Sequence, residues 1–382
     1  MYNIFTIKLL LILCLKLFLL GCNNSIQEES FIDYDALPEL QVTLAEEIIE
    51  DEDFYFGRIQ DLIVDSQGDI IVSDWAKMAI KQFDSNGNYL GEIASGGEGP
   101  GELQTFFFLF HSFNDTLLVF YPGAVGQVDI YTREKDENRY QYKETIDTKR
   151  HELRNISLLG RAPGGGYFAK AEEFVQNRQS QLFEPEPQKY EPLLVVNEAL
   201  EVLADSVDLL TIPNVVFIEA GGGAVSPLGT PPFLYRDVVR AVGQSHYMIA
   251  KPAEALIQFF DQNHGITNKI GLNVLQRPVS DADLENELEN ISEEFRAKLI
   301  ERAPEMKPAF KNAWIAKDKI FLHTDKTDKG SQIVVLTDAG QPLGKFYLSE
   351  FDEIKAFINN HIYTIHQDPD VGYSLKIYTI DL

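Results

Sequence analysis

The feature that most constrains the fold is a run of four short β-patterned segments between Ile59 and Ile93. This stretch reads IQDLIVDSQGDIIVSDWAKMAIKQFDSNGNYLGEI, and clusters of Asp, Ser, Asn and Gly separate its apolar segments. The expected strands are 59–64, 69–73, 79–83 and 89–93. Four consecutive antiparallel strands of this length form one blade of a β-propeller, so the segment predicts such a blade.

The same pattern returns along the rest of the chain. Further copies are expected at 106–146, 156–207, 238–272, 313–348 and 354–380. The last copy shows only three strands, and Leu40–Leu44 predicts the missing fourth. An N-terminal strand in the last blade would close the ring and remove its exposed edges. We therefore expect an all-β, six-bladed β-propeller of four-stranded antiparallel blades. The alternative is tandem β-sandwiches, because short strands alone do not dictate closure.

Three segments read as insertions into this repeat: 172–193, 212–235 and 281–303. Without them, the propeller domain at 37–382 has roughly 46 residues per blade, close to the ~40–50-residue period of propeller repeats. The first two are rich in Pro, Gly and polar residues and predict long surface loops. Segment 281–303 predicts a helix, with Ser280 as its N-cap and Pro304 after its end. Its apolar residues recur every three or four positions, so we expect that face to pack against the propeller.

The N-terminus has the pattern of an export signal. An apolar run at 9–20, interrupted by Lys16, is shorter than the ~20 residues that span a bilayer. It ends in Leu19-Leu20-Gly21-Cys22, which is similar to the bacterial lipoprotein signal box, where a small residue precedes the cysteine that takes up diacylglycerol. We predict a signal peptide at 1–22, lipidation of Cys22 and a flexible tether at 23–36. The alternative is an uncleaved membrane anchor.

Composition agrees with export and limits the partners. Cys14 would leave with the signal peptide and Cys22 would carry lipid, so the mature domain would hold no free thiol. The chain has 59 acidic and 33 basic residues, and loss of Lys8 and Lys16 would change its charge from −26 to −28. Such a charge excludes nucleic acid as an expected partner. An acyl anchor, rather than a basic patch, would hold the protein at a membrane. We expect an exported outer-membrane lipoprotein, on the periplasmic face or the cell surface.

Three pieces of the first repeat carry a family resemblance: VDSQGDIIVSD, IKQFDSNGNYLGEI and GGEGPGEL. They resemble the six-bladed β-propeller lipoproteins of Bacteroidota and related bacteria, which are relatives of NHL-repeat propellers. The resemblance is strong over 55–105 and weaker but colinear to the C-terminus. It implies the fold and an exported location. Members of that family share no single established activity, so the resemblance implies no function.

Strand register predicts where a ligand site would lie. In a propeller blade the innermost strand begins on one face and the second strand returns to it, so these strand ends converge around the channel mouth. The candidate ligand-binding residues there are Arg58, Asp74, Tyr121, Arg154, Lys170, Arg236, Lys251, Lys311, His323, Lys355 and His366. Their many cations suit carboxylate, sulfate or phosphate groups. The alternative is that these cations pair with nearby acids or point to solvent.

Two functions remain open from the sequence. The first is a binding or scaffold module without a cofactor, whose partner is an anionic small molecule, a glycan fragment or an envelope protein. A complete catalytic constellation is not visible, and no Gly-x-Ser-x-Gly elbow occurs. The second is a metal-dependent lyase or hydrolase of the lactonase type. There Asp74, His323 and His366 would hold calcium or zinc, which would polarise a carbonyl or activate water.

Overall fold

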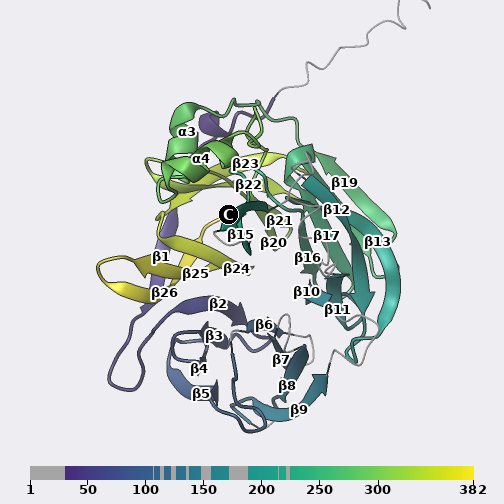
Figure 1. The fold of residues 1–382 in the computed structure, drawn as a ribbon, viewed down its shortest axis with the longest axis vertical. Helices are drawn as coiled ribbons and strands as arrows, with labels where there is room; N and C mark the ends of the chain where they lie inside the picture. Colours follow the sequence, from purple (N-terminus) through teal and green to yellow (C-terminus); the bar gives the residue numbers. More distant parts are fainter. Residues whose placement is uncertain are drawn as a thin grey trace, which may run out of the picture.

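Six four-stranded antiparallel sheets form a closed ring around a central channel, as Figure 1 shows. The computed structural model describes residues 31–105, 107–111, 116–121, 126–134, 137–147, 156–171, 188–213, 215–220 and 224–382. The six-bladed propeller expected from the repeats is therefore confirmed, and a tandem of sandwiches is not what forms.

Each blade takes its strands in chain order, from the channel outward. Blade 1 consists of β2 (Ile59–Val64), β3 (Ile70–Asp74), β4 (Ala79–Phe83) and β5 (Tyr89–Ser95). Blade 2 consists of β6 (Phe108–His111), β7 (Thr116–Tyr121), β8 (Gln127–Thr132) and β9 (Gln141–Asp147). Blade 3 consists of β10 (Ile156–Arg161), β11 (Tyr167–Ala171), β12 (Gln188–Val196) and β13 (Val202–Pro213). Blades 4 and 5 consist of β16 (Val238–Val242), β17 (His246–Lys251), β18 (Leu256–Asp261), β19 (Ile266–Gly271); and β20 (Asn312–Ala316), β21 (Lys319–Thr327), β22 (Gly330–Thr337), β23 (Pro342–Leu348).

Blade 6 is completed by the start of the chain. Strands β24 (Asp352–Ile358), β25 (His361–Asp368) and β26 (Gly372–Ile380) form its inner part, and β1 (Val42–Ile48) pairs antiparallel with β26. This confirms ring closure by an N-terminal strand, although the strand lies at Val42–Ile48 rather than Leu40–Leu44. Ile48 packs with Leu375 and Ile377 in the core between blades 6 and 1, so closure also buries apolar surface.

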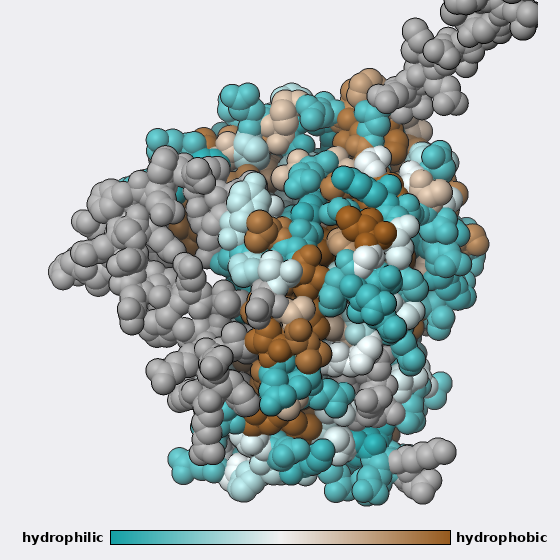
Figure 2. Space-filling model, turned by 90° about the vertical axis from the view of Figure 1, so that its right-hand side faces the viewer, coloured by the Kyte–Doolittle hydropathy of each residue, from teal (hydrophilic) through white to brown (hydrophobic). Residues whose placement is uncertain are grey.

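The core lies between neighbouring blades rather than at one centre. Strands β3 and β4 are buried along their whole length, and their polar residues are buried with the apolar ones: Asp74 of β3 pairs with Lys81 of β4. Aromatic pairs fill the gaps between sheets: the Phe321 and Phe357 rings stack at 4.2 Å across blades 5 and 6. Apolar residues also reach the outer edges of blades 3 and 4, where Leu203, Leu209 and Ile266 are exposed and Figure 2 shows an apolar band.

Strand direction places all long connections at one end of the ring. Each inner strand begins where the second strand ends, as in the pairs Ile59–Asp74 and Asn312–His323. We call this end the mouth. Because four strands alternate in direction, the connection from β11 to β12 and every connection between blades also lie at the mouth. The three expected insertions therefore share one face of the molecule, whereas the opposite end carries short turns.

For two of these insertions the structure differs from the prediction. The expected helix at 281–303 is two short helices, α3 (Asp281–Glu287) and α4 (Glu293–Ile300), although Ser280 forms the predicted N-cap as part of a capping box with Asp283. The segment 212–235, expected as a loop, contains the hairpin β14 (Val216–Ala220) and β15 (Ala224–Gly229). The segment 172–187 lies outside the described residues.

A small apolar cluster joins these two insertions. Leu288 and Leu299 of the helices are buried with Val216 of the hairpin, and Leu228 and Ile291 pack against them. The apolar helix face was expected to pack on the propeller body, but the hairpin covers it instead. Within the part of the chain that the structure describes, no helix is long and apolar enough to cross a membrane.

Candidate functional site

Strand pairing places four of the predicted site residues, Asp74, Lys170, His323 and His366, at the mouth end of their blades, and their role there stays a prediction. Asp74 lies opposite the start of β2, His323 opposite Asn312 and His366 opposite Asp352. Ser157 faces Lys170 at the start of β10. Two of the predicted site residues, Cys22 and Arg154, lie outside the described residues.

Most of the mouth lysines form ion pairs. The three pairs are Lys170 with Glu191 at 3.3 Å, Lys251 with Asp208 at 3.3 Å, and Lys311 with Glu287 at 3.2 Å. Each acid comes from a neighbouring strand or an insertion, so the mouth is less cationic than its lysines alone predict.

The two predicted arginines that the structure describes at the mouth differ from the lysines. Arg58 and Arg236 are exposed. The Arg58 guanidinium lies 5.9 Å from the centre of the Trp75 ring, a cation–π contact. Arg236 forms no ion pair within the described residues. It therefore remains the mouth cation most accessible to an anion from solvent.

Asp74 is a structural carboxylate. Its side chain is fully buried and accepts hydrogen bonds from the backbone N–H groups of Gly57 (2.8 Å) and Arg58 (2.9 Å) and from Lys81 Nζ (2.9 Å). Burial raises the pKa of Asp74, but these donors outweigh it and hold the pKa below its usual value. Its oxygens are thus occupied by the loop before β2 and by β4, and they are closed to a ligand.

Tyr121 belongs to the core rather than to the mouth surface. It is fully buried between blades 1 and 2, where its ring lies 6.4 Å from that of Phe107. Burial, together with the nearby carboxylate of Asp129, raises the pKa of Tyr121. The side chain of Tyr121, predicted to line the mouth, is instead fully buried in the core cluster between blades 1 and 2.

The two predicted mouth histidines have different environments. Burial and the ammonium of Lys311 lower the pKa of His323 to about 4, so this ring is neutral at physiological pH. His366 forms a 2.6 Å hydrogen bond through Nδ1 with Asp352, whose other oxygen accepts from the Tyr378 hydroxyl at 2.7 Å. The Asp352 carboxylate orients the His366 ring, as a hydrogen-bonded carboxylate orients many metal-ligating or catalytic histidines.

The predicted metal ligands do not come together. Asp74 is fully engaged in blade 1, and His323 and His366 lie in separate blades. Across the described residues, no group of three or more His, Cys, Asp or Glu side chains is placed to hold an ion. A metal site made of Asp74, His323 and His366 is therefore not what the fold builds.

A cavity of about 340 Å³ occupies the central channel, and all six inner strands contribute to its wall. It runs from Asp61 and Lys355, nearer the mouth, to Val64, Arg161 and Ile358 at the far end. The charged residues of the wall are Asp61, Arg161, Arg240 and Lys355, three cations and one acid. The channel is thus cationic inside a chain whose total formal charge is −26.

Arg240, on β16, is the best-placed cation of the channel. Its Nε donates to the carbonyl of Ala313 at 2.7 Å and its Nη2 to Asn312 Oδ1 at 3.2 Å, while its guanidinium lies 5.1 Å from the centre of the Trp314 ring. Two of its five N–H groups are thereby used, and the others remain for a ligand. The guanidinium lies within the wall of the channel, and burial there lowers the pKa of Arg240 to about 10.

Asp61 and Lys355 face the same part of the channel from blades 1 and 6. Lys355 Nζ donates to the carbonyl of Gln60 at 3.0 Å and lies 3.7 Å from Asp61 and 2.6 Å from Glu353. Burial raises the pKa of Asp61, and the charges of Lys355 and Arg240 oppose that rise. An acid and two cations from three blades thus share one level of the channel.

The sequence reading missed Arg240 and Arg161 because it considered only the strand ends. The signal was nevertheless present: Arg240 interrupts an otherwise apolar inner strand, VVRAV, and Arg161 ends ISLLGR. It also missed Asp237, which is buried at the start of β16 beside Lys251, and burial raises the pKa of Asp237 to about 6.

Comparisons with known proteins show the fold and nothing finer. No family model matches the chain, and no curated protein matches it. A solved structure of a Bacteroides fragilis protein described as exported has a TM-score of 0.51 at 10% identity, over 92% of this chain and 100% of that one. A DUF4221 family member from Bacteroides vulgatus has a TM-score of 0.47 at 10% identity, over 90% and 99%. The PQQ-bound aldose sugar dehydrogenase of Streptomyces coelicolor has a TM-score of 0.45 at 10% identity, over 91% of this chain and 100% of that one.

Proposed function

We propose that this chain is an exported, lipid-anchored envelope protein that binds a small anionic ligand in the channel of its propeller. The observation that carries the proposal is Arg240, whose guanidinium faces the cavity with unused N–H groups and no ion pair among the described residues. A carboxylate or sulfate would supply acceptors for these N–H groups.

Charge and size both favour such a ligand. Two strong cations, Arg240 and Lys355, face Asp61 at one level, so the pocket attracts an anion while the acid can accept from ligand hydroxyls. A volume of about 340 Å³ lies at the small end of ligand pockets, which suits one sugar ring rather than an oligosaccharide. A sugar acid therefore fits better than a glycan chain or a protein segment.

The anchoring part of the proposal rests on the sequence. Cys22 follows the lipoprotein-like box, and the exported Bacteroides fragilis protein shares the fold of this chain. We place the protein at the outer membrane, in the family of Bacteroidota propeller lipoproteins that the first blade resembles. Metabolic labelling with a palmitate analogue would test this, since Cys22→Ser should abolish the labelled band.

A metal-dependent lyase or hydrolase would need other ligands than those first expected. Asp74 has its oxygens occupied, and His323 and His366 come from separate blades. Of the residues named for that chemistry, only His366 has the oriented geometry of a functional imidazole, through its bond to Asp352.

The channel site is tested by calorimetry on the chain from Asn23 onward, which contains every strand of the ring. Glucuronate is the probe, and glucose is its neutral counterpart. Glucuronate should bind saturably and glucose at least tenfold more weakly. Arg240→Gln should weaken glucuronate binding about 10- to 100-fold, the effect of losing a charge-assisted hydrogen bond. The matched control is Lys269→Gln, which removes an exposed cation of the same blade. Equal affinity of Arg240→Gln and the unaltered chain, or no binding of glucuronate or sulfate at millimolar concentration, would refute the channel site.

A further inference from the structure

A second cavity, larger than the channel, lies at the mouth beside the helical insertion. Its volume is about 510 Å³, within the range of small-molecule pockets. Its walls come from four connections: 233–235, 252–255, 274–276 and 301–309. All four are connections at the mouth, so the cavity is built by connections and not by the strands of the blades.

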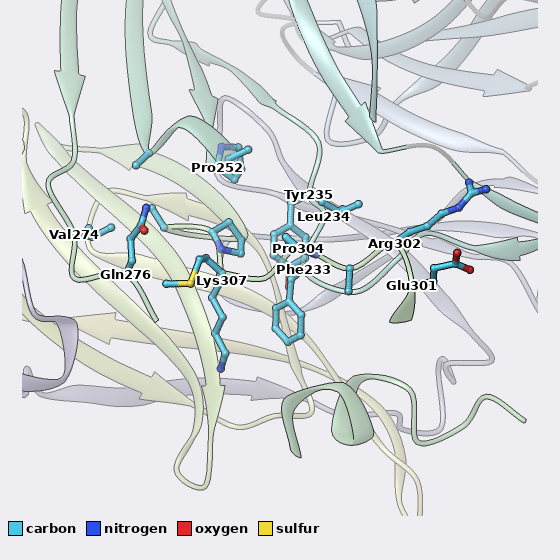
Figure 3. A pocket seen from close by; sticks show the side chains of 16 residues that line it. Phe233, Leu234, Tyr235, Pro252, Val274, Gln276, Glu301, Arg302, Pro304 and Lys307 are labelled. Atoms are coloured by element: carbon cyan, nitrogen blue, oxygen red, sulfur yellow. The ribbon is translucent and has the colours of Figure 1, made fainter. Parts of the chain in front are cut away.

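The walls of this pocket are mostly apolar and rigid. Pro252, Pro304 and Pro308 line it, and their fixed backbone angles keep the pocket open before any ligand binds. Phe233 is buried in the wall with a φ of 62°, a left-handed conformation that costs free energy in a bulky residue and is often kept at ligand sites. Figure 3 shows the Phe233 and Tyr235 side chains at the middle of the pocket.

The pocket contains one cation that has no ion-pair partner among the described residues. Arg302 is half-buried and forms no ion pair within the described part of the chain, and Glu301 beside it is exposed. Lys307, by contrast, is neutralised by Asp283 at 2.6 Å and Asp325 at 3.0 Å. Figure 3 shows Arg302 and Glu301 on the side of the pocket opposite Val274 and Gln276. A ligand with one anionic end and an apolar body would match this arrangement.

An exposed apolar rim adjoins the Val274 side. Phe31, Leu275 and Met306 are exposed to 62%, 52% and 37%. Backbone pairing holds them together, since Ile32 bridges to Val274, and Pro278 bridges to Met306. Exposed apolar residues that adjoin an apolar pocket mark a route for an apolar ligand or a contact with lipid.

The same rim is where the chain arrives from its predicted anchor. Phe31 follows Cys22 by nine residues, and nine residues span at most ~32 Å when fully extended. A lipid on Cys22 would therefore keep the rim within that distance of the bilayer. In Figure 1 the N-terminal segment, coloured purple, lies beside α3 at the same part of the ring.

We propose that this pocket binds a single-chain amphiphile with an anionic head group, of the fatty-acid type. The head group would lie at Arg302, and the hydrocarbon chain would run past Phe233 toward Val274 and the apolar rim. The pocket chemistry stands on the described residues alone. Supply of the amphiphile from the membrane rests on the lipid anchor of the proposed function.

The test is a titration of the chain from Asn23 onward with octanoate, decanoate and dodecanoate below their micelle concentrations. Affinity should rise about fourfold for each added methylene, because each buried methylene gains a constant increment of transfer free energy. Arg302→Gln should weaken dodecanoate binding about tenfold. Ala253→Trp, which places a ring into the pocket from an exposed wall position, should abolish it.

Controls separate this pocket from the channel and from a membrane-docking surface. Arg240→Gln should leave dodecanoate binding unchanged, whereas Arg302→Gln should leave glucuronate binding unchanged. If glucuronate fails to bind while dodecanoate behaves as stated, the channel site falls and the pocket stands. An affinity that is independent of chain length, or unaffected by both Arg302→Gln and Ala253→Trp, would overturn the proposal. Binding to phosphatidylcholine vesicles that Ala253→Trp leaves intact, with no binding of free dodecanoate, would overturn it in favour of surface docking. If Ala253→Trp fails to fold, Arg302→Gln and the chain-length series decide.

Discussion

The substitution Asp74→Asn should destabilise the propeller strongly at neutral pH. It removes the negative charge that compensates the ammonium of Lys81, 2.9 Å away, in a place where the two side chains are only 0% and 3% exposed. Leaving one partner of a buried ion pair uncompensated typically costs ~3–5 kcal/mol. With an unfolding entropy of ~2.1 cal/mol/K per residue over roughly 350 residues, this corresponds to a fall in Tm of roughly 4–7 °C.

The pH dependence gives this prediction a second test. The pKa of Asp74 is lowered in the folded protein, so its stabilisation is fully present above the unfolded value near 3.8 and is lost as the pH falls through the folded pKa. The difference in unfolding free energy between the unaltered chain and Asp74→Asn should therefore be constant from about pH 7 to 5 and shrink below pH 3.8.

Urea unfolding, followed by tryptophan fluorescence, measures both effects. The matched control is Asp84→Asn in the next turn of the same blade, where the carboxylate accepts only solvent-exposed hydrogen bonds and the expected cost is about 1 kcal/mol or less. The double variant Asp74→Asn with Lys81→Met should recover much of the loss, since both charges are then absent. If Asp74→Asn costs no more than Asp84→Asn, or the double variant is less stable than Asp74→Asn alone, the assignment of Asp74 as a buried charge partner is wrong.

Two further predictions follow from other parts of the ring. Burial and the ammonium of Lys311 lower the pKa of His323 to about 4. As the pH falls, His323 is therefore protonated in the unfolded chain at a higher pH than in the folded protein, and the free energy of unfolding should fall between about pH 6.5 and 4. Urea unfolding at pH 7, 5.5 and 4.5 measures this fall, and His323→Gln should make it smaller by roughly 2–3 kcal/mol. A pH profile of stability that His323→Gln leaves unchanged would contradict the prediction. A chain that starts at Asp51 lacks β1 and exposes the edge of β26, so size-exclusion chromatography should show aggregation, whereas a chain starting at Leu37 should stay monomeric. A monomeric, equally stable chain from Asp51 would show that β1 is dispensable for closure.

Strand periodicity predicted most of the fold because a blade depends on local signals. Asp65 and Asp84 each begin a turn, and their carboxylates accept hydrogen bonds from backbone N–H groups of that same turn. Because these contacts are local, the sequence predicts the hairpins. Ring closure could be predicted because the last repeat lacked a strand. The break between α3 and α4 could not, because the apolar stripe continues through it and only the second capping position, Ser292, marks the new start.

The candidate site was harder to predict because charge compensation is a long-range property. Register alone placed Lys170, Lys251 and Lys311 at the mouth. Their acids come from β12, β13 and the helical insertion, and nothing in the sequence ties Glu287 to Lys311. An arginine within an apolar inner strand, such as Arg240, is the more informative signal, since its own strand, VVRAV, holds no acid that could pair with it.

The distribution of connections explains why the larger of the two cavities lies at one end of this propeller. At the far end, hairpins close with short turns in which Asp65, Asp84 and Asp261 accept hydrogen bonds from backbone N–H groups. At the mouth, the connections between blades carry the hairpin, the helices and the N-terminal segment, and they build a 510 Å³ pocket without disturbing a single blade. The inner strands of the ring, which carry the cations of the channel, have the same arrangement whatever the mouth connections are. Chains that share this fold at about 10% identity can therefore differ in what they bind by changing the mouth connections and one or two inner-strand residues.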